Sequence, residues 1–120
     1  MIQIDSTPTS PKVYFDEKTH VFLIEGESYP ENSFEFYKPV FNWFDEVFPN
    51  LDRMELHLKI SYMNSSSVKC ILDVMTILEE AFEAGKNVRI KWFYEPENSR
   101  SLEMAEDFKE DLDLPFEVLS

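Results

Sequence analysis

The stretch from Met54 to Tyr62 alternates between apolar and polar side chains without a break. Successive side chains of a β-strand point to opposite faces of a sheet, so this alternation predicts a strand with one buried face and one face at least partly exposed to water. A sheet built around such a strand accepts helices on its buried face only. The predicted buried face consists of Met54, Leu56, Leu58, Ile60 and Tyr62, and the opposite face of Glu55, His57, Lys59 and Ser61.

Further strands and three helices are predicted on either side of this strand. Short apolar runs bounded by turn residues predict strands at Lys12–Asp16, His20–Ile24, Val88–Tyr94 and Phe116–Leu119, with a tight turn at 17–19 and a loop at 25–31. Helical spacing of apolar residues after capping residues predicts helices over Asn32–Phe48, from the serines after Asn64 to about Ala84, and from Ser101 to about Leu112. Gly85 is the expected C-cap of the second helix.

These elements follow the order β-β-α-β-α-β-α-β. Because each helix lies between two strands, crossover connections and a mixed sheet are favoured. The predicted fold class is α/β: a single-domain two-layer sandwich over residues 1–120, with a mixed sheet and the helices mainly on one face. Residues 1–11 contain Pro8, Pro11 and several Ser and Thr, and are expected to form an extended N-terminal arm before the fold begins.

The predicted first helix carries two neighbouring apolar stripes. One consists of Phe34, Tyr37, Phe41, Phe44 and Phe48, and the other of Phe36, Val40, Trp43 and Val47. Either the helix is wedged between the sheet and a second helix, or part of the second stripe is a docking surface for another protein. Pro39 lies inside this helix and predicts a kink or a later start.

Net charge restricts the partners of the chain. Twenty-four Asp and Glu against eleven Lys and Arg give −13, and no basic patch is present to replace the counterions of a nucleic acid or to bind an anionic membrane. No apolar run reaches the roughly 18 residues of a membrane span, and the N-terminus does not have the pattern of a secretory signal. The single Cys cannot form an internal disulfide. We therefore expect a cytoplasmic location, with proteins or small molecules as partners.

Few of the groups from which catalytic sites are built occur at useful spacing. His20 and His57 have no nucleophile or acid beside them at motif spacing, and Cys70 lies on an apolar stripe of the second helix, where a packing role is expected. Two glycines cannot form a phosphate-binding loop. We expect no enzyme, no cofactor and no metal site. The acidic residues of the third helix are interpreted as a solvated face rather than a divalent-cation site: Glu103, Glu106, Asp107, Glu110, Asp111 and Asp113.

Asn64 and three serines, Ser65, Ser66 and Ser67, stand between the alternating strand and the second helix. One of them is enough to cap the helix. The first carboxylate of that helix is Asp73, and a cation, Lys69, precedes it. A phosphate added here would meet free backbone N–H groups, the positive end of the helix dipole and one Lys. Capping alone and a phosphoserine site both remain open on these grounds.

Several segments, in this order and spacing, resemble the SiaC-type regulatory phosphoproteins of bacteria over nearly the whole chain. They are STP at 6–8, KVYFDE, SYPEN at 28–32, FYKPVFNWF, SYMNSSSVK, GKNVRIKWFYE and AEDFKEDLDLPFEV. The resemblance implies a fold like that of the anti-sigma-factor antagonists, the STAS fold, which agrees with the predicted order of elements.

The resemblance also implies a switch. In the family that this chain resembles, a hydroxyl directly after the Asn that ends the strand is phosphorylated by a Ser/Thr protein kinase of the histidine-kinase ATPase type, and a PP2C-type phosphatase removes the phosphate. The unphosphorylated protein binds and activates a diguanylate cyclase, which raises cyclic di-GMP. The matching position is Ser65, where the family pattern has Thr. Asn64, Ser66, Ser67 and Lys69 are expected around the phosphate.

The interface with the effector is expected beside the phosphorylation site. Its predicted residues are Tyr62 and Met63, together with Ser28, Tyr29, Pro30, Glu31 and Asn32. Three alternatives remain: an anti-sigma-factor antagonist or other switch with a different effector, a metal-dependent enzyme built on the acidic cluster, and a constitutive scaffold that self-associates through the aromatic helix.

Overall fold

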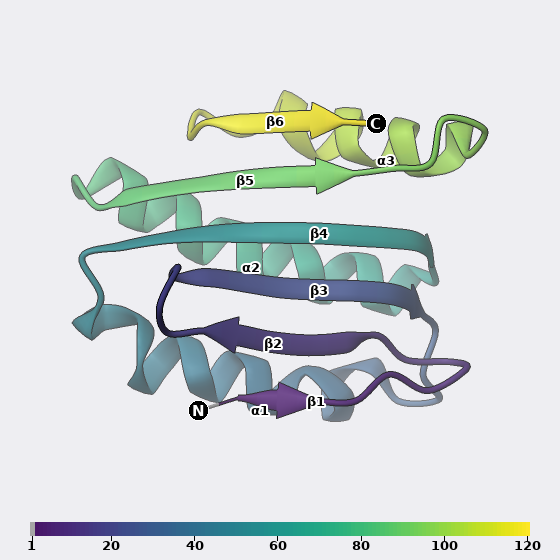
Figure 1. The fold of residues 1–120 in the computed structure, drawn as a ribbon, viewed down its shortest axis with the longest axis horizontal. Helices are drawn as coiled ribbons and strands as arrows, with labels where there is room; N and C mark the ends of the chain where they lie inside the picture. Colours follow the sequence, from purple (N-terminus) through teal and green to yellow (C-terminus); the bar gives the residue numbers. More distant parts are fainter. Residues whose placement is uncertain (1) are drawn as a thin grey trace.

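A computed structural model describes residues 2–120, which form a six-stranded sheet with three α-helices behind it (Figure 1). The strands are β1 (Gln3–Ile4), β2 (Lys12–Asp16), β3 (Val21–Ser28), β4 (Arg53–Met63), β5 (Asn87–Phe93) and β6 (Phe116–Leu119). The helices are α1 (Ser33–Glu46), α2 (Ser65–Glu83) and α3 (Ser99–Glu110), with a short 3₁₀ helix η1 (Phe48–Asn50) after α1.

The sheet is mixed, and its strands lie in chain order from β1 to β6. β1, β2 and β3 are antiparallel neighbours, whereas β3, β4, β5 and β6 run parallel to one another. Each parallel step is made through one of the three helices, and all three lie on the same side of the sheet (Figure 1). The predicted α/β class, mixed sheet and one-sided helical layer are confirmed.

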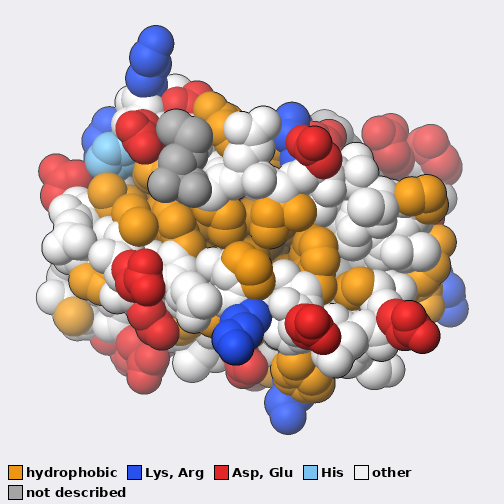
Figure 2. Space-filling model, turned by 90° about the horizontal axis from the view of Figure 1, so that it is seen from below, with side chains coloured by type: hydrophobic (Ala, Val, Ile, Leu, Met, Phe, Trp, Pro, Cys, Tyr) orange, Lys and Arg blue, Asp and Glu red, His pale blue; other side chains and the backbone are white. Residues whose placement is uncertain are grey.

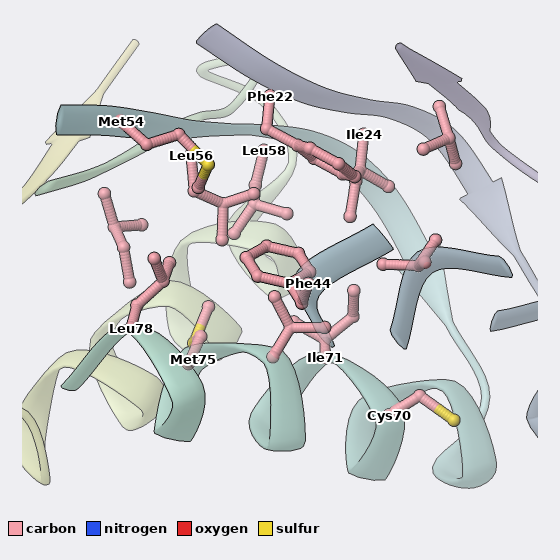
Figure 3. Packing of buried hydrophobic residues seen from close by; sticks show 14 of the residues in the cluster. Phe22, Ile24, Phe44, Met54, Leu56, Leu58, Cys70, Ile71, Met75 and Leu78 are labelled. Atoms are coloured by element: carbon pink, nitrogen blue, oxygen red, sulfur yellow. The ribbon is translucent and has the colours of Figure 1, made fainter. Parts of the chain in front are cut away.

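The core lies between that side of the sheet and the helices. Figure 3 shows side chains of β3 and β4 pointing toward Phe44 of α1 and toward Ile71, Met75 and Leu78 of α2. Cys70 is fully buried among them, and burial raises the pKa of its thiol, so the predicted packing role is confirmed. No helix within residues 2–120 is long and apolar enough to cross a membrane.

The alternation of β4 holds from Met54 to Ile60 and then breaks. The register between β3 and β4 shifts there: Gly26 is opposite Ile60, but Glu27 is opposite Tyr62. Ser61 is the extra residue of a β-bulge, which turns the following side chains over. Tyr62 is therefore 42% exposed and Met63 is buried. The predicted inward direction of Tyr62 is wrong for this reason.

Two strands differ from the prediction. β3 continues to Ser28 through residues predicted as a loop, because the parallel partner β4 supplies hydrogen bonds as far as Met63. The arm predicted for residues 1–11 contains β1, in which Gln3 pairs with Tyr14 and Ile4 with Val13. Two residues are too few to show alternation, so the sequence did not reveal this strand.

The helices also differ in detail. α1 continues through Pro39, and its buried face combines members of both apolar stripes. α3 begins at Ser99, two residues earlier than predicted, because the side chain of Asn98 caps it by accepting a hydrogen bond from Ser101 N. On α2, the apolar spacing predicts that Leu72 belongs to the buried stripe, but Leu72 is 42% exposed and Val74 is buried instead.

A band of apolar side chains crosses the molecule where β1 and α1 meet (Figure 2). Partly buried residues on these elements include Ile4, Phe36 and Val47. Nearby, a cavity is lined by Phe15, Trp43, Val47 and Leu51 among others. Both explanations of the second aromatic stripe thus have support, since Val40 and Trp43 are buried whereas Phe36 and Val47 are partly exposed. The docking surface stays a prediction.

Lys86, the residue before β5, contacts the 3₁₀ helix η1 and the residue that follows it, Leu51. Its Nζ donates to the carbonyls of Phe48, at 3.1 Å, and Leu51, and lies 4.6 Å from the centre of the Phe48 ring. The Phe48 carbonyl also accepts a hydrogen bond from Leu51 N at 3.0 Å, so the ammonium group is a second donor to this carbonyl and links η1 to the start of β5.

Replacing Lys86 with Met should keep the aliphatic contact and remove the hydrogen bonds. We expect Lys86→Met to lower the free energy of unfolding by about 1–2 kcal/mol, measured by urea denaturation. Lys38→Met is the matched control: Lys38 is exposed on α1, and its replacement should change stability by less than about 0.5 kcal/mol. Equal losses in the two variants would contradict the role assigned to Lys86.

Candidate functional site

The four residues between β4 and α2 form a tightly held corner. Asn64 has an extended backbone and caps α2: its Oδ1 accepts a hydrogen bond from Ser67 N at 2.9 Å. Its own backbone N–H donates to the carbonyl of Ser28 at 3.0 Å, which ties the ends of β3 and β4 together. The position of the serines is therefore fixed from both strands.

Behind this corner lies a buried chain of hydroxyl groups. Ser28 Oγ donates to Ser67 Oγ at 2.8 Å, and Tyr37 Oη lies 2.6 Å from Ser28 Oγ. Because the Ser28 hydrogen is used toward Ser67, Tyr37 is the donor in the second bond. Ser33 Oγ, from the first turn of α1, lies 3.1 Å from Ser67 Oγ and 3.4 Å from Asn64 Oδ1. The chain therefore joins α1, β3 and α2 through polar groups that have no access to water.

This network separates the three serines by role. Ser67 is fully buried and bonded on both sides. Ser66 is half-buried, and its Oγ donates to Ser33 Oγ at 2.8 Å. Ser65 is exposed, and its hydroxyl has no hydrogen-bond partner within residues 2–120. Of the three hydroxyls, that of Ser65 is the one that an approaching enzyme can reach without disturbing the corner.

The start of α2 provides an electrostatic environment that favours an anion at Ser65. The first turn of α2 contains no acidic residue. Lys69 lies one turn further on, but its Nζ is 5.9 Å from the centre of the Phe34 ring, on the side of α1. The first backbone N–H groups of a helix lack intrahelical acceptors and carry partial positive charge.

A shallow groove runs from this corner to α3. Residues of β4, α2 and α3 line it: Ser61, Tyr62, Met63, Asn64, Ser65, Arg100, Glu103, Met104 and Asp107. Two hydrogen bonds fix the start of α3 there, from Asn98 Nδ2 to the Ser61 carbonyl at 3.1 Å and from Ser101 Oγ to the Ile60 carbonyl at 2.9 Å. No local sequence pattern indicates that α3 contributes to this site, because only the three-dimensional arrangement brings the two helix starts together.

The residues predicted to contact a partner divide into exposed and buried ones. Tyr29 and Tyr62 are exposed and meet edge to face, with ring centres 5.6 Å apart. Glu31 and Asn32 are also exposed, and Pro30 is half-buried. Ser28 is fully buried in the hydroxyl chain, and Met63 is 6% exposed beside the groove. Ser28 therefore offers no contact surface, which corrects the prediction for this residue.

Two further apolar residues extend the exposed surface beyond the prediction. The large hydrophobic side chains that remain most exposed within residues 2–120 are Tyr29, Phe34, Tyr62 and Leu72. Phe34 is next to Lys69, and Leu72 is seven residues after Ser65, two turns along the same face of α2. The sequence contained a signal for the exposure of Phe34 that we did not use. Phe34 is the second residue of α1, and side chains in the first turn of a helix have no preceding turn to cover them.

The histidines lie away from this corner. His57 Nε2 is 2.9 Å from Glu55 Oε1 on the solvent-facing side of the sheet, and this hydrogen bond holds the pKa of Glu55 below its usual value. His20 Nδ1 is 3.0 Å from the Arg53 carbonyl. Within residues 2–120, no three His, Cys, Asp or Glu side chains are grouped closely enough to hold a metal ion.

Comparison with known proteins places this geometry in a family. Residues 4–120 match the SiaC family of regulatory phosphoproteins. An uncharacterized protein of Pseudomonas aeruginosa strain UCBPP-PA14 is 36% identical over 118 residues, which cover 98% of this chain and 94% of that protein.

Solved structures support the same family. A chain in the crystal structure of the diguanylate cyclase SiaD in complex with its activator SiaC, from P. aeruginosa, is 34% identical with a TM-score of 0.94, covering 99% of this chain and 98% of that chain. SiaC of P. aeruginosa in the apo form is 33% identical with a TM-score of 0.90 over the same shares. These similarities are to SiaC proteins, so the likeness to anti-sigma-factor antagonists stays a prediction.

Ser67 and Ser65 should differ sharply in their effect on stability. Ser67→Ala leaves the Ser28 hydrogen without its acceptor in a buried site, so we expect a loss of about 1–3 kcal/mol in the free energy of unfolding. Ser65→Ala should stay within about 0.5 kcal/mol of the parent. Urea denaturation of both variants measures the difference, and a costly Ser65→Ala would show that its hydroxyl has a structural partner.

Tyr37 should make the fold sensitive to alkaline pH. Burial raises the pKa of Tyr37 to about 12, against the Ser28 hydrogen bond, which lowers it. The unfolded chain releases this proton near pH 10.0 while the folded protein keeps it, so the stabilisation is complete below pH 10.0 and is lost as the pH rises through about 12.

The test compares the parent with Tyr37→Phe. Between pH 9 and 12 the parent should lose about 2 kcal/mol more in the free energy of unfolding than Tyr37→Phe does. Tyr29→Phe, which alters an exposed phenol, should follow the parent. Parallel pH curves for the parent and Tyr37→Phe would refute the assignment.

Proposed function

The chain belongs to the SiaC family of regulatory phosphoproteins, and we propose that it is a phosphorylation-controlled partner-switching protein that binds and activates a diguanylate cyclase. The observation that carries the proposal is the exposed, unbonded hydroxyl of Ser65 at a corner where neighbouring hydroxyls are buried and occupied. The SiaC of P. aeruginosa, which is similar over the whole chain, is an activator found in complex with the cyclase SiaD.

The proposed effector surface consists of the exposed apolar residues around Ser65, namely Tyr29, Phe34, Tyr62 and Leu72. Aromatic side chains that are partly exposed provide large contact areas at small cost in conformational entropy, and they are enriched in protein interfaces. The polar residues Glu31 and Asn32 would lie at its rim. The chain acts in this proposal as a ligand of the cyclase and catalyses no reaction itself.

Phosphorylation of Ser65 would switch this surface off. A phosphate adds −1.5 to −2 charges and three acceptor oxygens beside Tyr62. Docking would then require removal of water from that charge, and a penalty of ~3 kcal/mol reduces affinity about a hundredfold. Because the corner is fixed by its hydrogen bonds, no refolding is needed for this effect.

The enzymes that set the switch are proposed to be a Ser/Thr protein kinase of the histidine-kinase ATPase type and a PP2C-type phosphatase. An ATP-dependent kinase acts in the cytoplasm, which is consistent with the location expected for this chain. The acceptor at position 65 is Ser. Since its side chain is exposed and unbonded, transfer to Ser in place of Thr requires no change in the surrounding structure.

The first test identifies the modified residue. The protein is incubated with its kinase and ATP, and the phosphate is located by mass spectrometry. We expect one phosphate, on Ser65, and no phosphate in Ser65→Ala. Ser66→Ala is the matched control and should still be phosphorylated. Full phosphorylation of Ser65→Ala would show that another residue is the acceptor.

The second arm of the same test measures cyclic di-GMP formation by the cyclase. Unphosphorylated protein should stimulate the rate, and phosphorylation should reduce the stimulation tenfold or more. Ser65→Ala should stimulate equally before and after kinase treatment. If unphosphorylated protein captures an anti-sigma factor and leaves the cyclase rate unchanged, the effector is a different one.

A further inference from the structure

Ser65 and Arg100 face the same groove although 34 intervening residues separate them in sequence. Helices α2 and α3 both begin at the end of the sheet where β4 ends (Figure 1). Arg100 is the second residue of α3, and the hydrogen bonds of Asn98 and Ser101 to β4 hold that turn in place. The backbone of Arg100 is therefore fixed relative to Ser65.

Arg100 is available for a new contact. Its guanidinium forms no ion pair within residues 2–120, where the pairs involve His57, Arg89 and Lys91. The side chain is exposed, and among the described residues 2–120 it is the one Lys or Arg that lines this groove. Lys69, the cation nearest to Ser65 in sequence, does not line the groove and lies over Phe34 instead.

Two carboxylates in the groove would repel a phosphate on Ser65 unless a cation offsets them. Glu103 and Asp107 line the groove together with Ser65. A phosphate on Ser65 would add up to two negative charges to a space that already contains two, and like charges at short range repel. A guanidinium group can offset this repulsion, because it donates two parallel hydrogen bonds to phosphate oxygens.

We propose that Arg100 binds the phosphate on Ser65 and bridges the groove between α2 and α3 in the phosphorylated protein. The inference rests on the proposed function for the identity of the modified residue. Only the Arg100 side chain has to turn, since both helix starts are already fixed. The bridge would occupy the space beside Tyr62 and Met104 of this chain. The effector would then lose access to these two apolar side chains and would also meet the added charge.

This proposal changes the expected counter-ion of the phosphate. Lys69 is four residues after Ser65 and was the cation suggested by the sequence. Its contact with Phe34 places it on the α1 side of the helix, whereas the groove lies on the α3 side. Lys69 is therefore assigned to the exposed apolar surface and Arg100 to the phosphate.

The test uses full-length protein with phosphoserine incorporated at position 65 during translation, so that no kinase is required. Phosphorus NMR follows the second ionisation of the phosphate, whose pKa is ordinarily about 6. A nearby guanidinium favours the dianion and lowers this pKa. Arg100→Gln should therefore raise the titration midpoint by about 0.5 pH units or more, and Arg100→Lys should restore part of the difference.

Two controls separate a local contact from a general loss of positive charge. Lys69→Gln removes the other cation near Ser65, and Arg53→Gln removes one at the opposite end of β4. Arg53→Gln should leave the midpoint within about 0.1 pH units of the parent phosphoprotein, because exposed charges beyond a Debye length are screened. Lys69→Gln should raise the midpoint clearly less than Arg100→Gln does, because the Lys69 ammonium group lies over the Phe34 ring on the other side of α2. Unchanged urea denaturation of unphosphorylated Arg100→Gln would show that the variant is folded.

Arg100 is not the phosphate ligand if Arg100→Gln leaves the midpoint unchanged. A rise in Lys69→Gln alone would instead assign the phosphate to Lys69. These results are independent of the proposed function: failure of the kinase to modify Ser65 would overturn the switch, whereas the phosphorus titration would still report which cation the phosphate contacts.

Discussion

The hydrogen bond from the backbone N–H of Asn64 to the backbone carbonyl of Ser28 is the constraint on which the candidate site depends. It closes the parallel pair of β3 and β4 at the residue where β4 ends and α2 begins. Asn64 then uses its side chain to cap α2. One residue therefore ends a strand, starts a helix and sets the direction of the next side chain, that of Ser65. Without this bond neither the cap nor the exposure of Ser65 would be fixed.

The buried hydroxyl chain behind Asn64 adds specificity to this corner. Apolar side chains of similar size would fill the same space without any requirement for direction. A chain of hydroxyls has to place each donor against an acceptor, because an unsatisfied buried polar group costs about 1–3 kcal/mol. Tyr37, Ser28 and Ser67 meet this requirement with distances of 2.6 and 2.8 Å. The network thus favours a single arrangement of α1, β3 and α2, and it leaves Ser65 outside that arrangement.

The sequence predicted the parts of the fold that depend on local patterns. The alternation of β4, the helix start after Asn64 and the lack of acids before Asp73 could each be read from neighbouring residues. The bulge at Ser61 could not, because it exists only as a change of register against β3. Arg100 was missed for a similar reason: its place beside Ser65 follows from how α3 docks on β4, and no local pattern encodes that docking.

A net charge of −13 argues at first sight against regulation by one more anion. The charges are spread over the chain, however, and at physiological ionic strength interactions between exposed charges fade beyond about 8 Å. What a phosphate on Ser65 meets is therefore decided by its immediate neighbours: an acid-free helix turn, and the groove residues Arg100, Glu103 and Asp107. In the proposed bridge, the guanidinium of Arg100 offsets the repulsion between the phosphate and the two carboxylates of the groove. The switch then depends on local charge geometry, and the total charge of the protein has little influence on it.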